Sequence, residues 1–395
     1  MAATLTILFS AIFIFAYGGY VVPAWLWMKM SPHTNRQKTT DLPSVTFIVA
    51  AYNEEDTIEE KIKNTLLLQY PKDKINFLFV TDGSTDATPA IVSKYPIISL
   101  QHQTERDGKS MAINRAMQKV NTDIVIFSDA NTYLNSDAIM HIAKEFFYPH
   151  IGGVAGEKKV LKIDRGGVSS EAEGLYWKYE SWLKNFDAQF HTTVGAAGEL
   201  FAIRTSLYTH TPREVLLDDF IISMKICLKG WKIAYNKNAV AAEYPSENLA
   251  EEQKRKKRIA TGAFQSVVLL KELFYFWKHP RLTYLYVSHR LLRWIICPFL
   301  LPIIFITNVF AITQENHVFF EGLLVLQCCF YLLAATGAWL DRKKRKHPLF
   351  SIPFYFLFMN FNMYIGLYRF LYTTPSGIWE KAQRVKQREF STINN

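Results

Sequence analysis

Residues 44–58, SVTFIVAAYNEEDTI, and residues 75–88, INFLFVTDGSTDAT, decide the fold of this chain. Each stretch begins with an apolar run short enough for a buried strand and continues into polar, turn-forming residues. Asp56 and Glu59 have the spacing of a helix start, so a helix is expected to connect the two strands. We therefore expect parallel strands with crossover helices, which is the arrangement of a doubly wound α/β domain.

The same alternation continues to residue 128. Apolar runs at 97–100 and 124–128 are expected to be further strands, and residues 109–120 have the spacing of a helix that buries one face. In a doubly wound sheet the ligand binds beyond the carboxyl ends of the strands. The sequence has no GxxxxGK[ST] phosphate loop, and no GxGxxG follows the first strand, so a nucleotide would have to be bound in another way.

Three of the expected strands end in polar or acidic residues. Residues 51–55 follow the first strand, Asp82 follows the second, and Asp129 and Asn131 follow the last. Because parallel strands end at one edge of a sheet, these side chains should lie at one rim. Carboxylates and phosphates repel each other, and Mg²⁺ or Mn²⁺ can bridge them through oxygen ligands. We therefore expect Mg²⁺ or Mn²⁺ to take part in binding a phosphate-bearing ligand here.

Four segments contain no charged residue and reach or approach the roughly 20 residues that a helix needs to cross a bilayer. They are Leu5–Met28, Trp294–Ile312, Gly322–Leu340 and Leu349–Tyr368. A cleaved signal peptide is the alternative for the first segment, but no Lys or Arg precedes it and it is too long for a signal core. Asn360 and Asn362 are costly in lipid, so the last segment could either cross the membrane or lie in the interface.

The formal net charge is +10, which allows nucleic-acid binding as one interpretation. The basic residues, however, cluster beside the apolar segments, at 254–258, at Arg290 and Arg293, and at 342–346. Such clusters are typical of cytosolic loops, and they attract anionic lipid head groups. We therefore expect a lipid bilayer and no nucleic acid among the partners, with the α/β domain facing the cytosol.

These patterns divide the chain into five expected regions. They are an N-terminal transmembrane anchor (1–29), an α/β domain (40–250), basic interfacial amphipathic helices (251–293), a C-terminal transmembrane region with two or three spans (294–372), and a basic tail (373–395). The compact layout suits an integral protein of a bacterial inner membrane.

Six segments of the α/β region, in chain order, resemble the motifs of family 2 glycosyltransferases, which have the GT-A fold. They are SVTFIVAAYNEEDTI (44–58), FVTDGSTDAT (79–88), RDGKSMAINRAM (106–117), FSDANTYL (127–134), VGAAGELFAIR (194–204) and LLDDF (216–220). The resemblance implies a Rossmann-like domain that binds a nucleotide-diphosphate sugar, with a UDP-sugar as the expected donor. It also implies metal-dependent transfer of the sugar to an acceptor hydroxyl, with inversion at the anomeric carbon.

The resemblance further implies roles for single residues. Nucleotide-sugar binding is implied for Ala51, Tyr52, Asn53, Glu54, Asp82, Lys109, Asp129, Arg255 and Arg258. Metal binding is implied for Asp129 and Asn131, and a position on the acceptor side for Gly198, Glu199 and Arg204. Asp219 would be the catalytic base, and the neighbouring carboxylate of Asp218 would raise its pKa.

The sequence departs from the family pattern at two positions. Asn131 stands where the family usually has the second metal-binding Asp, and Ile259 stands where a Q-x-x-R-W element has its Trp. Because polymer-forming synthases usually carry that Trp, we favour the addition of one or a few sugars to a lipid-linked or cell-envelope glycan. A processive synthase of the hyaluronan, poly-N-acetylglucosamine or cellulose type is the alternative, and other polysaccharide-assembly proteins are further candidate partners.

Each acidic residue taken alone has a simpler interpretation. Asp82 could be a turn residue, and Asp129 and Asp218 could be caps. Their joint occurrence at expected strand and helix ends favours a catalytic site. From other classes of protein, a membrane transport component and a binding protein with a degenerate transferase domain are the alternatives. The small number of spans and the lack of an acidic residue within them disfavour transport.

Overall fold

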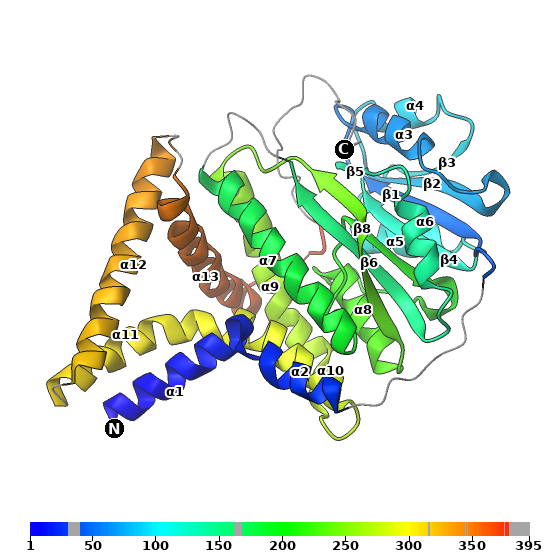
Figure 1. The fold of residues 1–395 in the computed structure, drawn as a ribbon. Helices are drawn as coiled ribbons and strands as arrows, with labels where there is room; N and C mark the ends of the chain where they lie inside the picture. Colours follow the sequence, from blue (N-terminus) through cyan, green and yellow to red (C-terminus); the bar gives the residue numbers. More distant parts are fainter. Residues whose placement is uncertain are drawn as a thin grey trace.

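The computed structural model describes residues 1–30, 40–161, 168–314, 317–343, 345, 347–374 and 376–378. Figure 1 shows an α/β domain on one side of the molecule and a group of long helices on the other. The expected α/β fold with additional apolar helices is confirmed. Most of the expected basic tail lies outside the described residues.

Eight strands of the described chain form one mixed sheet in the order β3-β2-β1-β4-β7-β6-β8-β5. They are β1 (Val45–Ala51), β2 (Ile75–Asp82), β3 (Ile98–Gln103), β4 (Ile124–Asp129), β5 (Thr132–Leu134), β6 (Ile151–Val160), β7 (Leu200–Arg204) and β8 (Lys232–Glu243). The strands β3, β2, β1 and β4 run parallel, as the sequence predicts, whereas β7 is antiparallel to both β4 and β6.

The register of the parallel strands places their polar ends at one edge. Val45 of β1 pairs with Ile75 of β2 and with Ile124 of β4, so the three strands begin at the same level. At the other end, Ala50 lies opposite Asp129. The segments that follow β1, β2 and β4 therefore meet at one rim of the sheet.

Helices cover both faces of the sheet (Figure 1). One buried cluster packs α3 (Ile58–Leu66), α4 (Thr88–Val92) and α6 (Ala138–Glu145) on one face. A second cluster packs α5 (Lys109–Met117), α7 (Val168–Phe190) and α8 (Asp218–Leu228) on the other. Short 3-10 helices lie at Lys72–Lys74, Thr205–Leu207 and Lys271–Phe274. Burial of apolar surface on both faces holds the strands, and hence the rim, in place.

The N-terminal apolar segment is not one continuous helix, which differs from the expectation for Leu5–Met28. The helix α1 (Ala2–Ile14) continues into a π-helical turn, η1 (Phe15–Gly19), and then a separate helix, α2 (Val21–Lys29). The break lies at Gly18, whose φ of 149° is open to glycine but strained for other residues. As a result, α2 packs against the α/β domain, with the ring of Trp27 5.6 Å from that of Phe190.

The C-terminal part of the chain is helical. It contains α9 (Leu249–Leu269), α10 (Pro280–Leu285), η5 (Tyr286–Ile296), α11 (Cys297–Gln314), α12 (Val318–Arg342) and α13 (Pro348–Tyr372). The helices α1 and α11 pack together, and α13 packs against both α12 and α9. Gly366 allows the close approach of α13 to α9, because a Cβ there would lie 2.5 Å from the Cβ of Ala260.

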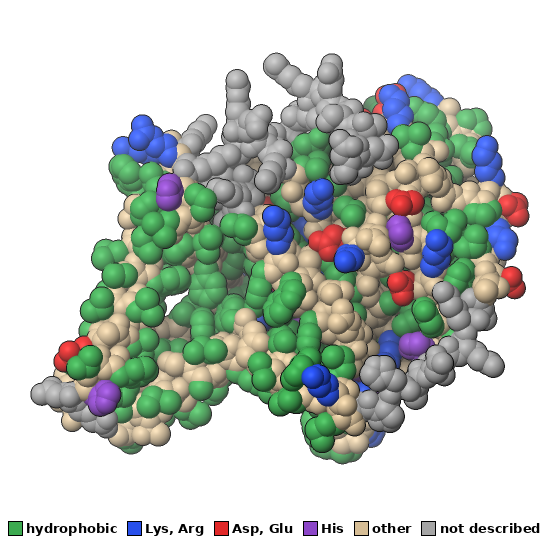
Figure 2. Space-filling view, in the orientation of Figure 1, with side chains coloured by type: hydrophobic (Ala, Val, Ile, Leu, Met, Phe, Trp, Pro, Cys, Tyr) green, Lys and Arg blue, Asp and Glu red, His purple; other side chains and the backbone are tan. Residues whose placement is uncertain are grey.

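Four helical segments of the described chain are long and apolar enough to cross a membrane, which indicates a membrane protein. They are Ala2–Gly19, Pro280–Gln314, Val318–Arg342 and Pro348–Tyr372. Figure 2 shows a mainly hydrophobic surface over the long helices, with Lys, Arg, Asp and Glu side chains gathered over the α/β domain. In Pro348–Tyr372, the side-chain amides of Asn360 and Asn362 donate to backbone carbonyls of their own helix, which reduces their cost in an apolar setting.

Candidate functional site

A cavity of about 940 Å³ opens at the rim of the sheet and extends to η1, η5 and α13. Eleven of the residues for which the resemblance implies a role in the site line it: Tyr52, Glu54, Lys109, Asp129, Asn131, Gly198, Glu199, Asp218, Asp219, Arg255 and Arg258. They come from the ends of β1 and β4, from the starts of α5 and α8, from the loop before β7, and from α9. The fold thus brings together residues that are far apart in the sequence, from Tyr52 to Arg258.

The acidic and basic groups at the centre of the cavity surround Gly198. Lys109, the first residue of α5, donates to Oδ1 of Asp129 over 2.5 Å. A Cβ placed on Gly198 would lie 3.2 Å from Nζ of Lys109, 3.3 Å from Oδ2 of Asp219 and 3.9 Å from Oδ2 of Asp129. The absence of a side chain at Gly198 therefore keeps open the space between these three groups.

Asp219 is a carboxylate at the start of α8 whose surroundings raise its pKa. It is the second residue of α8, and its Oδ1 accepts a hydrogen bond from the backbone N–H of Phe220 at 2.8 Å. Burial and the adjacent carboxylate of Asp218 raise the pKa of Asp219 to about 7, against the opposing effect of Lys109. A carboxylate with a pKa near neutrality can accept a proton more readily than an ordinary Asp.

Lys109 remains positively charged in this setting. Burial alone would lower its pKa, but Asp129, Asp218 and Asp219 outweigh that effect and raise the pKa above the usual value for lysine. The ammonium group can therefore offset negative charge on a bound phosphate group at the sheet rim.

The residues after β1 and β2 hold the neighbouring turns together. Asn53, with a φ of 51°, accepts a hydrogen bond from the backbone N–H of Thr85 at 2.8 Å. Asp82 is buried, and its Oδ2 accepts from the backbone N–H groups of Asp107 and Gly108 at 3.0 and 2.7 Å. Asn53 and Asp82, together with the buried strand residue Ala51, shape the rim and do not line the cavity itself.

Arg204 lies away from the cavity, although the sequence motif associates it with the acceptor side. It pairs with Ile124 at the start of β4, whereas Ser128 at the other end of β4 pairs with Leu200. Four strand residues separate the two positions, a distance of roughly 13 Å. Its guanidinium donates to the backbone carbonyls of Phe146 and Ile151, so its contacts here are structural.

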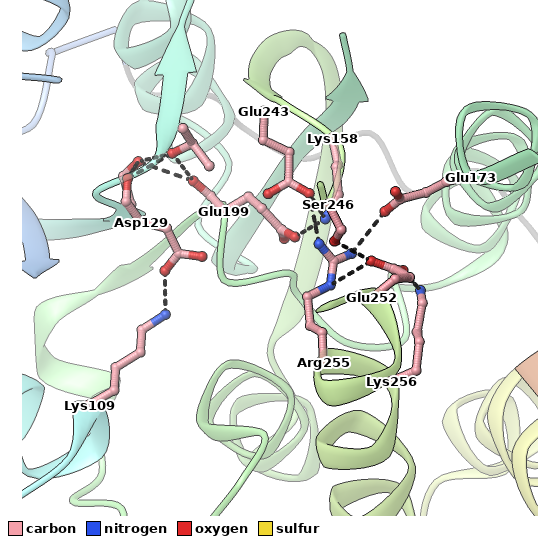
Figure 3. Close-up of polar contacts among 12 residues, drawn as sticks. Lys109, Asp129, Lys158, Glu173, Glu199, Glu243, Ser246, Glu252, Arg255 and Lys256 are labelled. Atoms are coloured by element: carbon pink, nitrogen blue, oxygen red, sulfur yellow. Dashed lines mark hydrogen bonds and ion pairs between the residues drawn. The ribbon is translucent and has the colours of Figure 1, made fainter. Parts of the chain in front are cut away.

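Arg255 is the centre of a buried ionic network, which Figure 3 shows. Its guanidinium lies 3.0 Å from Glu173 and 3.2 Å from Glu243. Lys158 bridges Glu243, at 2.6 Å, to the carboxylate of Glu199. The expectation that residues 254–258 form a membrane-surface patch is therefore wrong for Arg255, and also for Lys256, which is buried and lies 3.2 Å from Glu252.

Glu199 connects this network to the end of β4. Its carboxylate binds Lys158, and that contact, with Arg255 close by, outweighs burial and holds its pKa well below the usual range. Its backbone carbonyl accepts a hydrogen bond from the hydroxyl of Ser128, next to Asp129, at 3.1 Å. Movement of the network would therefore shift Ser128 and, with it, the position of Asp129.

Lys61 also supports the end of β4, and the sequence motifs do not single it out. It is fully buried, and its ammonium donates to Oγ of Ser128 at 2.8 Å and to the carbonyl of Thr132 at 2.7 Å. Burial lowers its pKa to about 7. From sequence alone, a lysine in an amphipathic helix is expected to face the solvent. The contacts of Lys61 with the end of β4 could therefore not be inferred without the fold.

Arg290 and Arg293 also differ from expectation. The sequence places them in a basic cluster at the membrane surface, but both are buried. They contact the two carboxylate oxygens of Glu180, at 2.5 and 3.1 Å. The same carboxylate accepts from His289, and Asp187 binds both His289 and the hydroxyl of Tyr20. These contacts join α7 to η5 and to the N-terminal helices.

The comparisons with known proteins agree with this architecture. The fold is that of a GT-A glycosyltransferase: a mannosyltransferase from Pyrobaculum calidifontis, solved in complex with GDP-Man and Mn²⁺, has a TM-score of 0.66 at 23% identity, over 94% of this chain and 99% of that one. Residues 46–209 match the Glycosyl transferase family 2 model, so this chain contains a family 2 glycosyltransferase domain.

Two kinds of curated relative illustrate the range of similar proteins. A poly-beta-1,6-N-acetyl-D-glucosamine synthase of Staphylococcus aureus is 27% identical over 248 residues, which is 59% of this chain and 57% of the relative. A beta-monoglucosyldiacylglycerol synthase of a Nostoc species is 26% identical over 217 residues, or 51% and 45% of the two chains. The matches thus span about half the length of these relatives.

Proposed function

We propose that the chain is an inverting glycosyltransferase that moves a sugar from a nucleoside-diphosphate sugar to a lipid-linked or cell-envelope glycan. UDP-sugars are the expected donors. The observation that carries the proposal is the arrangement around Gly198, where Lys109, Asp129 and Asp219 face one another in a large cavity. The expected location is the cytosolic face of a bacterial inner membrane, in keeping with the four apolar helices.

The reaction follows from the charges in the cavity. The acceptor hydroxyl attacks the anomeric carbon, the bond from that carbon to the diphosphate oxygen breaks, and Asp219 takes the hydroxyl proton. The electron pair of the broken bond leaves on the nucleoside diphosphate, and the ammonium of Lys109 offsets part of this charge. A single displacement from the opposite face inverts the anomeric configuration.

Asp129 and Asn131 are suited to hold Mg²⁺ or Mn²⁺. Both line the cavity, and together they offer one carboxylate and one amide oxygen. The described residues contain no group of three or more His, Cys, Asp or Glu side chains placed for a metal. Two protein oxygens fit a cation whose other ligands come from a diphosphate and water, which is a common arrangement for Mg²⁺. When bound, the cation would neutralise diphosphate charge.

A polysaccharide synthase is the second candidate. The similarity to poly-beta-1,6-N-acetyl-D-glucosamine synthases over 59% of this chain favours it. Ile259, which lines the cavity where the synthase motif has Trp, favours short products. Sizing of the product made from one nucleotide sugar separates the two candidates, since a synthase yields a long polymer and a single-addition enzyme yields a product one sugar longer.

The proposed function predicts metal-stimulated turnover of one donor in a panel of nucleotide sugars. The full-length protein in detergent is incubated with UDP-, GDP- and dTDP-sugars, and release of the nucleoside diphosphate is measured with Mg²⁺, with Mn²⁺ and with EDTA. We expect release from at least one UDP-sugar with a divalent cation and its loss with EDTA. Binding of donors without any release would instead support a degenerate binding protein.

Gly198→Ala is predicted to impair transfer without unfolding the protein. The added methyl would lie 3.2 Å from Nζ of Lys109 and 3.3 Å from Oδ2 of Asp219, and overpacking of this kind costs about 1–3 kcal/mol. We expect kcat/KM to fall roughly tenfold or more. Gly174→Ala on α7 is the matched control, because among the described residues nothing beyond its chain neighbours and the backbone of its own helix lies within 4 Å of a Cβ there. Equal activity of the two variants would contradict the importance of the open space at Gly198.

A further inference from the structure

The end of the cavity away from Asp129 is formed by helices of the membrane part. Residues of η1, η5 and α13 line it, among them Tyr17, Trp294 and Phe356. These helices belong to three of the segments that are long and apolar enough to cross a membrane. The cavity therefore connects the catalytic carboxylates with a largely apolar region.

Lys184 is a buried cation that lines the cavity. It lies on α7, is 4% exposed and belongs to the cavity lining. Within the described part of the chain its ammonium makes no hydrogen bond or ion pair, and it lies 5.5 Å from the centroid of the Trp177 ring. Burial lowers its pKa, and Glu180 and Glu199 act in the opposite direction. Burying a charged group without an ionic partner costs free energy, and an anion bound beside Lys184 would offset that cost.

Two more cations lie on the same side. Lys184 follows Glu180 by one helical turn, and Glu180 is the carboxylate shared by Arg290 and Arg293. On Arg293, Nε and Nη1 have no hydrogen-bond partner among the described residues. Glu180 thus serves two guanidinium groups and His289. Within the described residues, Glu180 and Glu199 lie near the ammonium of Lys184 without forming an ion pair with it, so its hydrogen-bond donors are unused.

We propose that Lys184, Arg290 and Arg293 form a subsite for the phosphate group of a long-chain lipid that carries the acceptor, a proposal that rests on the proposed function. A phosphate supplies several charged acceptor oxygens for the unused donors, whereas a neutral sugar would leave the ammonium unpaired. The apolar side chains of η1 and α13 suit the hydrocarbon chain. Free phosphate shares the head-group chemistry but would make no use of these side chains.

The test is binding of geranylgeranyl phosphate to the full-length protein in detergent micelles, measured by the change in tryptophan fluorescence. Removing a hydrogen bond to a charged group costs enough to expect Lys184→Gln to weaken binding about tenfold or more. Lys184→Arg keeps the charge and should retain most of the affinity. Lys178→Gln is the matched control, since Lys178 is an exposed residue of the same helix. Thermal unfolding of each variant checks that the fold is retained.

Two further ligands distinguish the sources of the phosphate chemistry. Geranylgeraniol lacks the phosphate, and inorganic phosphate lacks the lipid, so both should bind at least tenfold more weakly than geranylgeranyl phosphate. Inorganic phosphate binding as tightly as the lipid phosphate would overturn the assignment to a lipid. Equal binding of the alcohol, or unchanged binding by a folded Lys184→Gln variant, would overturn the subsite itself.

The outcomes separate this subsite from the proposed function. Sugar transfer by the wild-type protein, together with lipid-phosphate binding that does not depend on Lys184, would refute the subsite and leave the transferase. Lipid-phosphate binding that depends on Lys184, together with no turnover of any nucleotide sugar, would support the subsite and refute the transferase.

Discussion

Asp219→Asn is expected to reduce sugar transfer by roughly 100- to 10,000-fold, the range for loss of a positioned acid–base group. Asn has nearly the same shape as Asp and can still accept the hydrogen bond that Phe220 donates, so the start of α8 should keep its geometry. It cannot, however, take a proton from the acceptor hydroxyl. Affinity for the nucleotide sugar, measured by calorimetry, should change little, whereas kcat should collapse.

The pH dependence of the wild-type protein provides a second readout for Asp219. Its pKa of about 7 means that the carboxylate is protonated below this pH and available as a base above it. The rate of transfer should therefore rise as the pH increases through about 7, and a bound cation would move the midpoint lower. Asp73→Asn, at an exposed position, is the control and should keep the wild-type profile. Wild-type turnover by Asp219→Asn would remove this residue from the reaction.

Arg255→Met is expected to have the largest effect on stability, because it removes the cation shared by three buried carboxylates, those of Glu173, Glu243 and Glu252. Glu173 would lose its ionic contact with Arg255, while Glu243 would keep its contact with Lys158 and Glu252 its contact with Lys256. Breaking a buried pair in this way costs about 3–5 kcal/mol. The loss is measured as a fall in the thermal unfolding temperature of the full-length protein in detergent. Arg255→Lys should restore part of it.

Lys254→Met is the matched control for the change at Arg255. It lies one position earlier on α9, and its side chain is 47% exposed beside Glu251. Exposed pairs contribute about 0–1 kcal/mol, so this variant should unfold close to the wild-type temperature. If both variants unfolded together near the wild-type temperature, the network would have no structural importance. If Arg255→Met were stable but inactive, Arg255 would contact the donor directly, as the sequence motif implies.

The local sequence patterns determined the parallel part of the sheet. Short apolar runs followed by turn residues predicted β1, β2, β3 and β4, because burial of strands between helix layers requires them. The strands β5, β6, β7 and β8 were not predicted. Glycines or charged residues interrupt the apolar pattern of β6 and β8, whereas β5 and β7 are only three and five residues long. Lys158 of β6 and Glu243 of β8 belong to the ionic network, so no local signal distinguished them from surface charges.

The tertiary structure decided which charged residues face water and which are buried. In the sequence, Arg255, Arg290 and Arg293 have the composition of a membrane-surface patch, yet each lies against a glutamate that arrives from α7 or β8. Sequence position cannot reveal such partners, because a buried ion pair depends on two distant elements meeting at a few ångströms.

The sequence by itself determined the class of fold, the apolar helices and the polar residues at the strand ends, because these depend on the order of residues along one element. The tertiary structure decided the kink at Gly18, the remote position of Arg204 and the burial of Lys184. Each of these depends on packing between elements, so the physical reason is the same. The burial of a side chain and its electrostatic partners depend on contacts between distant elements, and no single segment of sequence contains them.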